Sequence, residues 1–451
     1  RDIMGGKENI IAVIGDGSMS GGEALEGLNV AGELNSNFII VFNDNQMSIA
    51  ENHGGMYDQF AELRRTNGAA ENNLFKSMGL DYLYVNDGND IEALIAAFEQ
   101  VKDSTHPVVV HINTLKGKGY APAEANKEKW HWHMPFDIQT GQSPASGSSE
   151  SYASIFAEYA LKRAKTDPKF LVLMSAVPGL LGLTQERREE LGKHYLDVGI
   201  AEETAVAMAS GAAHAGAHVV WGSSATFIQR TYDQLTQDLA LNQNPAVIVG
   251  SGSIRGLMAA THQGLSSISM IANIPNMVYL APSNAEEYIA MLDWALEQDK
   301  HPVYIAIPSG PVVHAEGPVR TNFDALNTYE VTRKGSKVAV LALGDFYNLG
   351  EKTVEALSST LGIEATLVKP YFASGVDQNL LDNLVKDHEV IVTIEDGIIE
   401  GGWGQNIASY LGTSSARVLN YGVKKAFYDR VNIADLMRES HLDSELIAAD
   451  V

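Results

Sequence analysis

IIAVIGDGSMSGG (residues 10–22) and NFIIVFNDNQMSI (residues 37–49) are the two stretches that decide the fold. Each carries an apolar run typical of a buried strand, and the first passes through Gly15–Gly17 into a helical pattern. A glycine-rich turn at a helix start suits a phosphate, but Asp16 would repel a phosphate unless a cation lay between them. Asp16 and Asn45 therefore predict two oxygen ligands for a divalent metal that neutralises a bound diphosphate.

The composition narrows the class of protein. A chain of 451 residues predicts two to four domains, and its 45% hydrophobic and 20% charged content is ordinary for a globular protein. With 32 basic and 56 acidic residues the net charge is −24, which argues against nucleic-acid or membrane partners. The absence of cysteine excludes disulfides and thiolate chemistry. Without a signal peptide we expect a cytoplasmic protein, and the lead-in from Arg1 suggests that an N-terminal piece completing the site is missing.

Short β-branched runs alternate with helical patterns along the whole chain, which is typical of βαβ units and parallel sheets. We expect three doubly wound α/β domains in series. One long helix is expected over 228–242 in the second of them. The expected parts are a diphosphate- and metal-binding domain, a linker, a second α/β domain, a polar connector and a third α/β domain, at residues 1–136, 137–151, 152–312, 313–334 and 335–451.

The glycine motif has two other interpretations. The series Gly15, Gly17, Ser20 and Gly21 comes near the dinucleotide fingerprint, with Asp44 in the place of the ribose-binding acid, and this would indicate a nicotinamide-dependent dehydrogenase. Such a site normally has no acid between its first two glycines, because its diphosphate binds without a metal. A purely structural turn is the third interpretation. We favour the metal and diphosphate site.

A series of motifs in the same order resembles the thiamine-diphosphate-dependent transketolase superfamily, and is most similar to the 1-deoxy-D-xylulose-5-phosphate synthases. They are GDGSMSGGEALEGLN, NDNQMSI, KGKGYAPAE, DVGIAEETAV, SATFIQRTYDQ, THQG, IPNMVYLAPS and EDGIIEGGWG. The resemblance implies two thiamine-diphosphate-binding folds and a transketolase C-terminal-like domain, in a homodimer that uses thiamine diphosphate and Mg²⁺. It also implies a role in isoprenoid biosynthesis: transfer of a two-carbon unit from a keto donor, pyruvate by closest likeness, to an aldehyde.

The resemblance also implies roles for individual residues. Asp16, Asn45 and the backbone carbonyl of Met47 would ligate Mg²⁺. Glu202 would hydrogen-bond the aminopyrimidine ring and so activate the cofactor, although taken alone it is an acid at a helix N-terminus, favoured there by the helix dipole. Phe227 would stack on the pyrimidine. The cofactor-binding residues that the resemblance implies are Gly15, Gly17, Ser18, Asn45, Ile49, Tyr120, Glu202 and Phe227.

Two of the 13 histidines fall in family motifs. His131 matches a Trp-His segment, with His133 as a less favoured substitute, and His262 matches Thr-His-x-Gly. Either could move a proton to a developing alkoxide, because imidazole titrates near neutral pH. We therefore predict Glu202, His131 and His262 as the catalytic residues.

The acceptor end departs from the family pattern. The departures are Gly252 or Ser253 and Ser309 where the family has arginines, Ser224 for a tyrosine, and Thr204 for a histidine. Arg255 is a candidate to compensate. Since paired arginine contacts are the favoured way to hold a phosphate monoester, we hypothesise that the acceptor lacks a terminal phosphate or binds it differently. A transketolase-type reaction with a ketose donor and a non-catalytic paralogue are the remaining alternatives.

Overall fold

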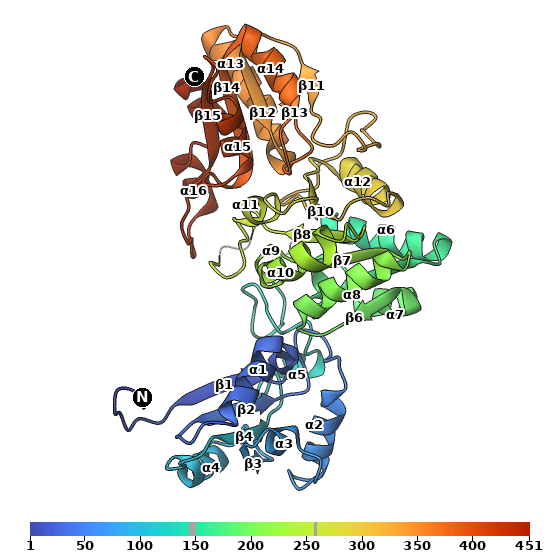
Figure 1. Cartoon of the computed structure of the whole chain (residues 1–451). Coiled ribbons are helices and arrows are strands. Elements are labelled where there is room, and N and C mark those ends of the chain that lie inside the picture. Colours follow the sequence, from blue (N-terminus) through green and yellow to red (C-terminus); the bar gives the residue numbers. More distant parts are fainter. Residues whose placement is uncertain (144–149, 257–258) are drawn as a thin grey trace. The chain divides into compact units, whose positions relative to one another are not determined.

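The computed structural model describes residues 1–143, 150–256 and 259–451, and contains three sheets (Figure 1). The chain divides into two compact units. The first consists of Arg1–Ser148 with two short later segments, Met174–Pro178 and Asp197–Glu202, and the second contains the rest of the chain. One sheet belongs mainly to the first unit, and the other two belong mainly to the second.

The first sheet has the strand order β1-β2-β4-β3, and all of its pairs are parallel. Its strands are β1 (Ile11–Gly15), β2 (Ile39–Asp44), β3 (Asp81–Val85) and β4 (Val108–Asn113). Its helices are the 3₁₀ turn η1 (Gly17–Ser20), α1 (Gly22–Ala31), α2 (Met56–Arg65), α3 (Leu74–Ser77), α4 (Ile91–Val101) and α5 (Ala121–Ala125). The first two predicted strands are thus confirmed as neighbours, and their carboxyl ends meet at one edge of the sheet.

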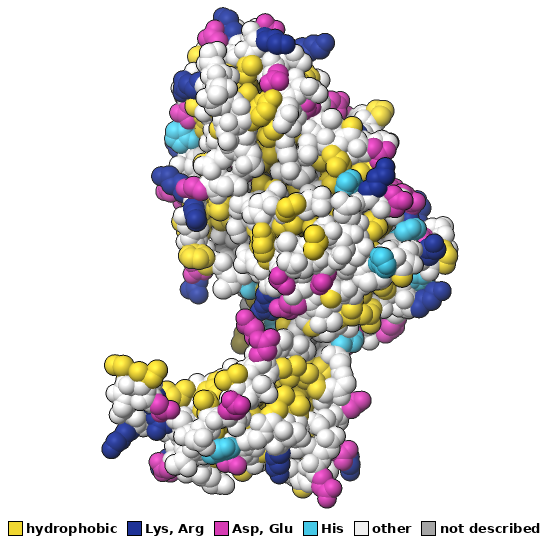
Figure 2. Space-filling view, viewed as in Figure 1, with side chains coloured by type: hydrophobic (Ala, Val, Ile, Leu, Met, Phe, Trp, Pro, Cys, Tyr) yellow, Lys and Arg dark blue, Asp and Glu magenta, His cyan; other side chains and the backbone are white. Residues whose placement is uncertain are grey.

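Strand β1 lies at the edge of this sheet and is unusually exposed. The side chains of Ile11 and Val13 are 54% and 74% exposed, whereas Ile39–Val41 of the adjacent strand β2 are buried. Hydrophobic side chains are visible on this part of the surface in Figure 2 (yellow). An outer strand of this composition leaves apolar surface uncovered within the unit.

The second sheet has the strand order β6-β5-β7-β8-β10-β9. Its strands are β5 (Phe170–Met174), β6 (Tyr195–Asp197), β7 (His218–Ser224), β8 (Val247–Ser251), β9 (Val278–Leu280) and β10 (Val303–Ala306). The accompanying longer helices are α6 (Tyr152–Thr166), α7 (Gln185–Leu191), α8 (Glu202–His214), α11 (Ser267–Ile271) and α12 (Ala285–Glu297), with short 3₁₀ turns η2 (Pro178–Leu181) and η3 (Gly192–His194).

The helix expected over 228–242 is confirmed as a helical run, which extends without a gap from Ala225 to Ala240, but its hydrogen-bond pattern is irregular. The run consists of α9 (Ala225–Ile228), the 3₁₀ turn η4 (Gln229–Thr231), α10 (Tyr232–Gln234) and the π-helical η5 (Leu235–Ala240). Two threonine hydroxyls donate to backbone carbonyls of the preceding turn, Thr231 to Ile228 at 2.8 Å and Thr236 to Tyr232 at 2.7 Å. Such bonds compete with the regular backbone ladder and favour irregular turns.

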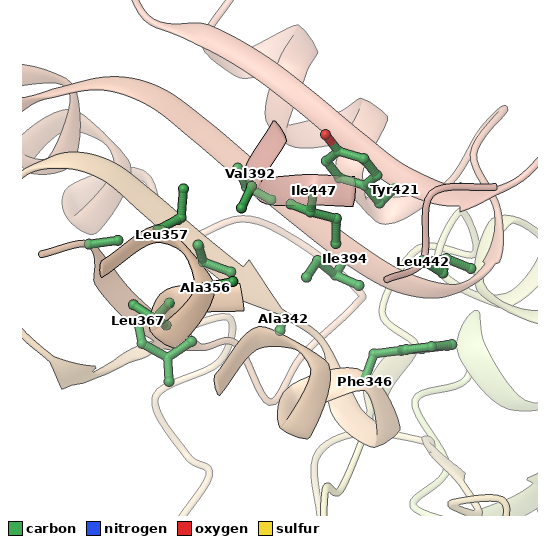
Figure 3. Packing of buried hydrophobic residues seen from close by; sticks show 14 of the residues in the cluster. Ala342, Phe346, Ala356, Leu357, Leu367, Val392, Ile394, Tyr421, Leu442 and Ile447 are labelled. Atoms are coloured by element: carbon green, nitrogen blue, oxygen red, sulfur yellow. The ribbon is translucent and has the colours of Figure 1, made fainter. Parts of the chain in front are cut away.

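The third sheet has the order β11-β13-β12-β14-β15 and is parallel except for its edge strand β11. Its strands are β11 (Glu330–Arg333), β12 (Lys337–Ala342), β13 (Thr366–Lys369), β14 (His388–Ile398) and β15 (Arg417–Val423). Its helices are η6 (Gly344–Phe346), α13 (Tyr347–Leu361), α14 (Gln378–Asp387), α15 (Trp403–Tyr410), α16 (Ile433–Glu439) and α17 (Ser444–Asp450). The predicted connector 313–334 therefore ends in a strand. Figure 3 shows the core of this part, where Val392 and Ile394 of β14 lie near Leu357 of α13 and Ile447 of α17.

The predicted linker 137–151 is described only at its two ends, since residues 144–149 lie outside the described part of the chain. At one end the Asp137 carboxylate accepts backbone hydrogen bonds from Gln139 and Thr140. At the other end Ser151 begins α6 through a capping box with Ser154. None of the helices in the described part of the chain is both long and apolar enough to span a bilayer.

Candidate active site

Asp16 lies directly after β1, at the carboxyl edge of the first sheet, and is only 1% exposed. Its carboxylate accepts a hydrogen bond from Asn52 Nδ2 at 2.6 Å and another from the backbone N–H of Asn45. Burial raises the pKa of Asp16, and the nearby Asp44 raises it further. The predicted residues Asp16 and Asn45 thus lie next to each other. The surroundings of the Asp16 carboxylate disfavour its negative charge.

The oxygen atoms around Asp16 fit a divalent cation. Asn52 Oδ1 is buried and has no hydrogen-bond partner among the described residues, although the same side chain donates to Asp16. Asn45 Oδ1 accepts a hydrogen bond from the backbone N–H of Met47 at 3.2 Å, which fixes the orientation of the side chain. No group of three or more His, Cys, Asp or Glu side chains in the described ranges could hold a metal, so a site here depends on amide and carbonyl oxygens.

Gly17 is required by close packing. A Cβ atom at this position would lie 2.7 Å from Ser48 Cβ, so a side chain there would push the segment after β2 away. The same segment is held from the other side, because Lys116 Nζ donates to the carbonyl of Ser48. Gly17 and Ser18 form the turn η1, and Ile49, at 36% exposed, follows Ser48.

Lys116 also lies 3.1 Å from His131, between Nζ and Nδ1. Burial lowers the pKa of both groups, and Lys116 lowers that of His131 further. Sequence reasoning missed Lys116 even though it opens the quoted segment KGKGY. It missed Asn52 as well, and neither residue type carries a signal strong enough to single it out.

His133 faces elsewhere. Its ring stacks on Trp130 with centroids 4.5 Å apart, and its Nδ1 lies 2.9 Å from the carbonyl of Met134. Tyr120 packs against the same Trp130 at 5.0 Å, and its hydroxyl is buried without a hydrogen-bond partner in the described part of the chain. The structure therefore favours His131 over His133 as the histidine near Ser48.

Asp44 has a different environment from Asp16. It is fully buried, it pairs with Arg64, and it lies 3.0 Å from Nε2 of His111, whose Nδ1 contacts the Tyr82 hydroxyl at 2.8 Å. Burial alone would raise the pKa of Asp44, but the hydrogen bonds from His111 and Arg64 outweigh burial and lower it. Because these partners enclose Asp44, it cannot serve as the ribose-binding acid of the dinucleotide interpretation.

Glu202, Phe227 and His262 come from the later part of the chain. Glu202 is the first residue of α8 and is 2% exposed. The rings of Phe227 and His262 meet edge to face with centroids 5.5 Å apart, and Thr261 Oγ1 lies 2.8 Å from His262 Nδ1. Both rings line a pocket of about 670 Å³, so the structure brings these two predicted residues together.

Ser253 and Ser309, which lie at or next to the positions where the resemblance leads us to expect arginines, belong to a hydrogen-bonded network with two acids. Ser253 Oγ donates to Asp396 at 2.5 Å and lies 2.7 Å from Ser309 Oγ. The backbone N–H and hydroxyl of Ser309 both reach one oxygen of Asp345, at 3.0 and 2.6 Å. Burial, and then Asp345, raise the pKa of Asp396 to about 6. We call these four residues the serine–aspartate network.

Arg255 does not compensate for the missing arginines. Its guanidinium lies 3.4 Å from the Asp345 carboxylate, donates to the Asp345 carbonyl at 3.0 Å, and rests 4.6 Å from the ring centroid of Phe346. The charge of Arg255 is thus directed toward an acid of the protein. Sequence reasoning had no signal for this, because Asp345 lies 90 residues further along the chain.

Comparison with known proteins agrees with the fold. Three family models match in series: 1-deoxy-D-xylulose-5-phosphate synthase over residues 1–72 and 65–114, the transketolase pyrimidine binding domain over 149–312, and the transketolase C-terminal domain over 327–447. Transketolase from Campylobacter jejuni is a structural neighbour with a TM-score of 0.56 at 18% identity, covering 98% of this chain and 77% of that one.

The sequence relatives identify the family more specifically than the structural neighbour does. The 1-deoxy-D-xylulose-5-phosphate synthase of Clostridium tetani is 32% identical over 490 residues, covering 100% of this chain and 78% of the relative, and that of Clostridium perfringens is 34% identical, covering 90% and 71%. The chain belongs to the 1-deoxy-D-xylulose-5-phosphate synthase family, and is a thiamine-diphosphate-dependent transferase of the transketolase type that transfers a two-carbon unit to an aldehyde.

Proposed function

We propose that this chain transfers the two-carbon unit of pyruvate, with release of carbon dioxide, to an aldehyde whose anionic group does not bind at Ser253 and Ser309. The serine–aspartate network carries this proposal, because both hydroxyls already contact carboxylates. Two like charges 4 Å apart repel by about 4 kcal/mol at an effective dielectric constant of 20. A phosphate placed there would meet two acids instead of two guanidinium groups.

We propose that Asp16, the side chain of Asn45 and the carbonyl of Met47 hold Mg²⁺. The buried Asp16 carboxylate has a raised pKa and the adjacent Asn52 Oδ1 has no partner among the described residues, so a cation would stabilise both. Backbone N–H groups at Gly17 and Ser18 would face the diphosphate. Lys116, close to Ser48, would add positive charge beside it.

When bound, thiamine diphosphate supplies a carbon nucleophile and accepts the electron pair left by decarboxylation. Glu202 would hold a proton against a ring nitrogen of the pyrimidine, in a position where water hardly competes since Glu202 is 2% exposed. Phe227 would stack on the pyrimidine, and Ile49 and Tyr120 would pack along the thiazolium.

We propose that His131 and His262 move protons at the acceptor. Lys116 donates to Nδ1 of His131, so the neutral ring carries its proton on Nε2, from where it can donate to a developing alkoxide. In His262 the Thr261 hydroxyl contacts Nδ1, so Nε2 is the ring nitrogen that Thr261 does not engage. We also propose that the enzyme works as a homodimer, which sedimentation analysis would test.

The central experiment measures carbon dioxide released from carboxyl-labelled pyruvate with and without an aldehyde. We expect release that depends on the aldehyde, whereas a transketolase-type reaction with a ketose donor releases none. A second arm compares the Ser309→Ala variant with the unmodified enzyme on a phosphorylated aldehyde. A rise in KM above about tenfold, the value of one charge-assisted hydrogen bond, would contradict the proposed position of the acceptor.

A further inference from the structure

The pocket lined by Phe227 and His262 has basic but no acidic side chains among its described lining residues, although the chain carries a net charge of −24. Its charged lining residues are Arg230 and Lys425, and no Asp or Glu is among the described residues that line it. The volume of about 670 Å³ lies in the usual range for small-molecule pockets. A lining that contains lysine and no carboxylate favours an anionic ligand over a cationic one.

Lys425 reaches this pocket from the third sheet. It lies on the loop after β15, and its backbone N–H donates to Glu400 Oε2 at 2.9 Å. The hydroxyl of Tyr428 donates to the carbonyl of Lys424 at 2.9 Å, which ties the loop to itself. These two contacts hold the backbone around Lys425, and neither of them uses its side chain, which belongs to a residue that lines the pocket. Glu400 does not line the pocket.

The same pocket is lined by Arg230 and by the predicted catalytic histidine, His262. The Arg230 guanidinium lies 5.8 Å from the centroid of the Phe227 ring, whose edge-to-face partner is His262. The pocket therefore contains both an imidazole, which can transfer a proton, and a lysine, which can attract an anion. An aldehyde with a distal anionic group could use both.

We infer that this pocket binds the anionic end of the acceptor, with Lys425 as the specificity-determining contact in place of the family arginines. The ligand class is a short aldehyde that carries a phosphate or a carboxylate. The inference rests on the proposed function, since it assigns the acceptor of that reaction. It adds a residue that follows the third sheet to a pocket that also contains Phe227 and His262.

The first test measures binding without turnover. Inorganic phosphate is titrated into the full chain loaded with thiamine diphosphate and Mg²⁺, by calorimetry, in the Lys425→Met variant and in a matched control, Lys424→Met. Lys424 is the exposed neighbour that does not line the pocket. We expect at least a tenfold loss of phosphate affinity for Lys425→Met, no more than a twofold change for the control, and recovery in Lys425→Arg. Equal affinities in the two methionine variants would overturn the inference.

The second test measures KM for three acceptors, glyceraldehyde 3-phosphate, glyoxylate and glyceraldehyde. Lys425→Met should raise KM at least tenfold for an anionic acceptor, with little change in kcat or in the KM for glyceraldehyde. An effect on the phosphorylated aldehyde alone assigns phosphate, and an effect on both anions assigns the broader class. If no carbon dioxide is released from pyruvate, the proposed function fails while the phosphate titration still decides the role of Lys425.

Discussion

Asp16 and Asp44 are neighbouring buried carboxylates with opposite roles, and exchanging each for asparagine separates them. The Asp16→Asn variant removes a charge that its environment disfavours and loses the charged part of the hydrogen bond from Asn52. These two effects oppose each other, so without ligands we expect a change in stability within about 1 kcal/mol. The Asp44→Asn variant instead leaves Arg64 and His111 without their acid, which should cost about 3–5 kcal/mol.

The two variants should differ in the opposite sense in how strongly ligands stabilise them. At free Mg²⁺ and thiamine diphosphate 100-fold above the dissociation constant, binding stabilises the unmodified protein by about 2.7 kcal/mol. Asp16→Asn should lose this increment, and Asp44→Asn should keep it. Because the pKa of Asp16 is raised, its contribution to stability in the ligand-free protein falls as the pH rises through that pKa, and the Asp16→Asn variant should lack this decline.

The assay is hydrogen exchange of peptides from β1 and β2, with and without ligands. Exchange is preferred to a single melting temperature because the chain has two compact units, and local protection reports on the first unit alone. Protection by ligands that persists in Asp16→Asn, or that disappears in a folded Asp44→Asn variant, would refute the assignment of the metal to Asp16.

Three further predictions follow from the site. Glu202→Gln should lower kcat at least 100-fold and slow deuterium exchange at the reactive carbon of thiamine diphosphate, measured by NMR, and unchanged exchange would contradict its role. His131→Ala should lower kcat about 100-fold while its neighbour His133→Ala changes it less than threefold, and equal effects in steady-state assays would reject the choice between them. The pKa of Asp396 is raised to about 6, so the contribution of this group to the free energy of unfolding is complete below about pH 4 and is lost as the pH rises through 6. In urea unfolding at pH 4.5 and 7, the Asp396→Asn variant should therefore lose less stability between the two pH values than the unmodified protein. An identical loss in both proteins would count against this.

The sequence predicted best what depends on neighbouring residues in the chain. The apolar runs before Asp16 and Asn45 predicted two parallel strands, and their polar ends do meet. A local pattern and a common topology are sufficient here, because the carboxyl ends of parallel strands converge. Phe227 and His262 were singled out by the family resemblance instead, and the edge-to-face contact of their rings was not predicted.

Contacts between distant segments could not be predicted in this way. Asp396 lies 143 residues from Ser253, and no pattern in either segment predicts the hydrogen bond between them. The partners of Asp44 also depend on packing, since Arg64 and His111 come from α2 and β4. The change from α-helical to 3₁₀ and π-helical bonding around Thr231 involves hydroxyl bonds that a hydrophobic periodicity does not predict.

The serine–aspartate network also limits what a basic substitution at position 309 could achieve. An arginine introduced at position 309 would arrive beside Asp345 and Asp396, and the two acids would neutralise it before any substrate did. Removing Asp345 to accommodate such an arginine would also leave Arg255 without the carboxylate that it contacts, whereas removing Asp396 would not. Of the two aspartates, Asp396 is therefore the one whose loss would free position 309 at the smaller cost to the surrounding contacts.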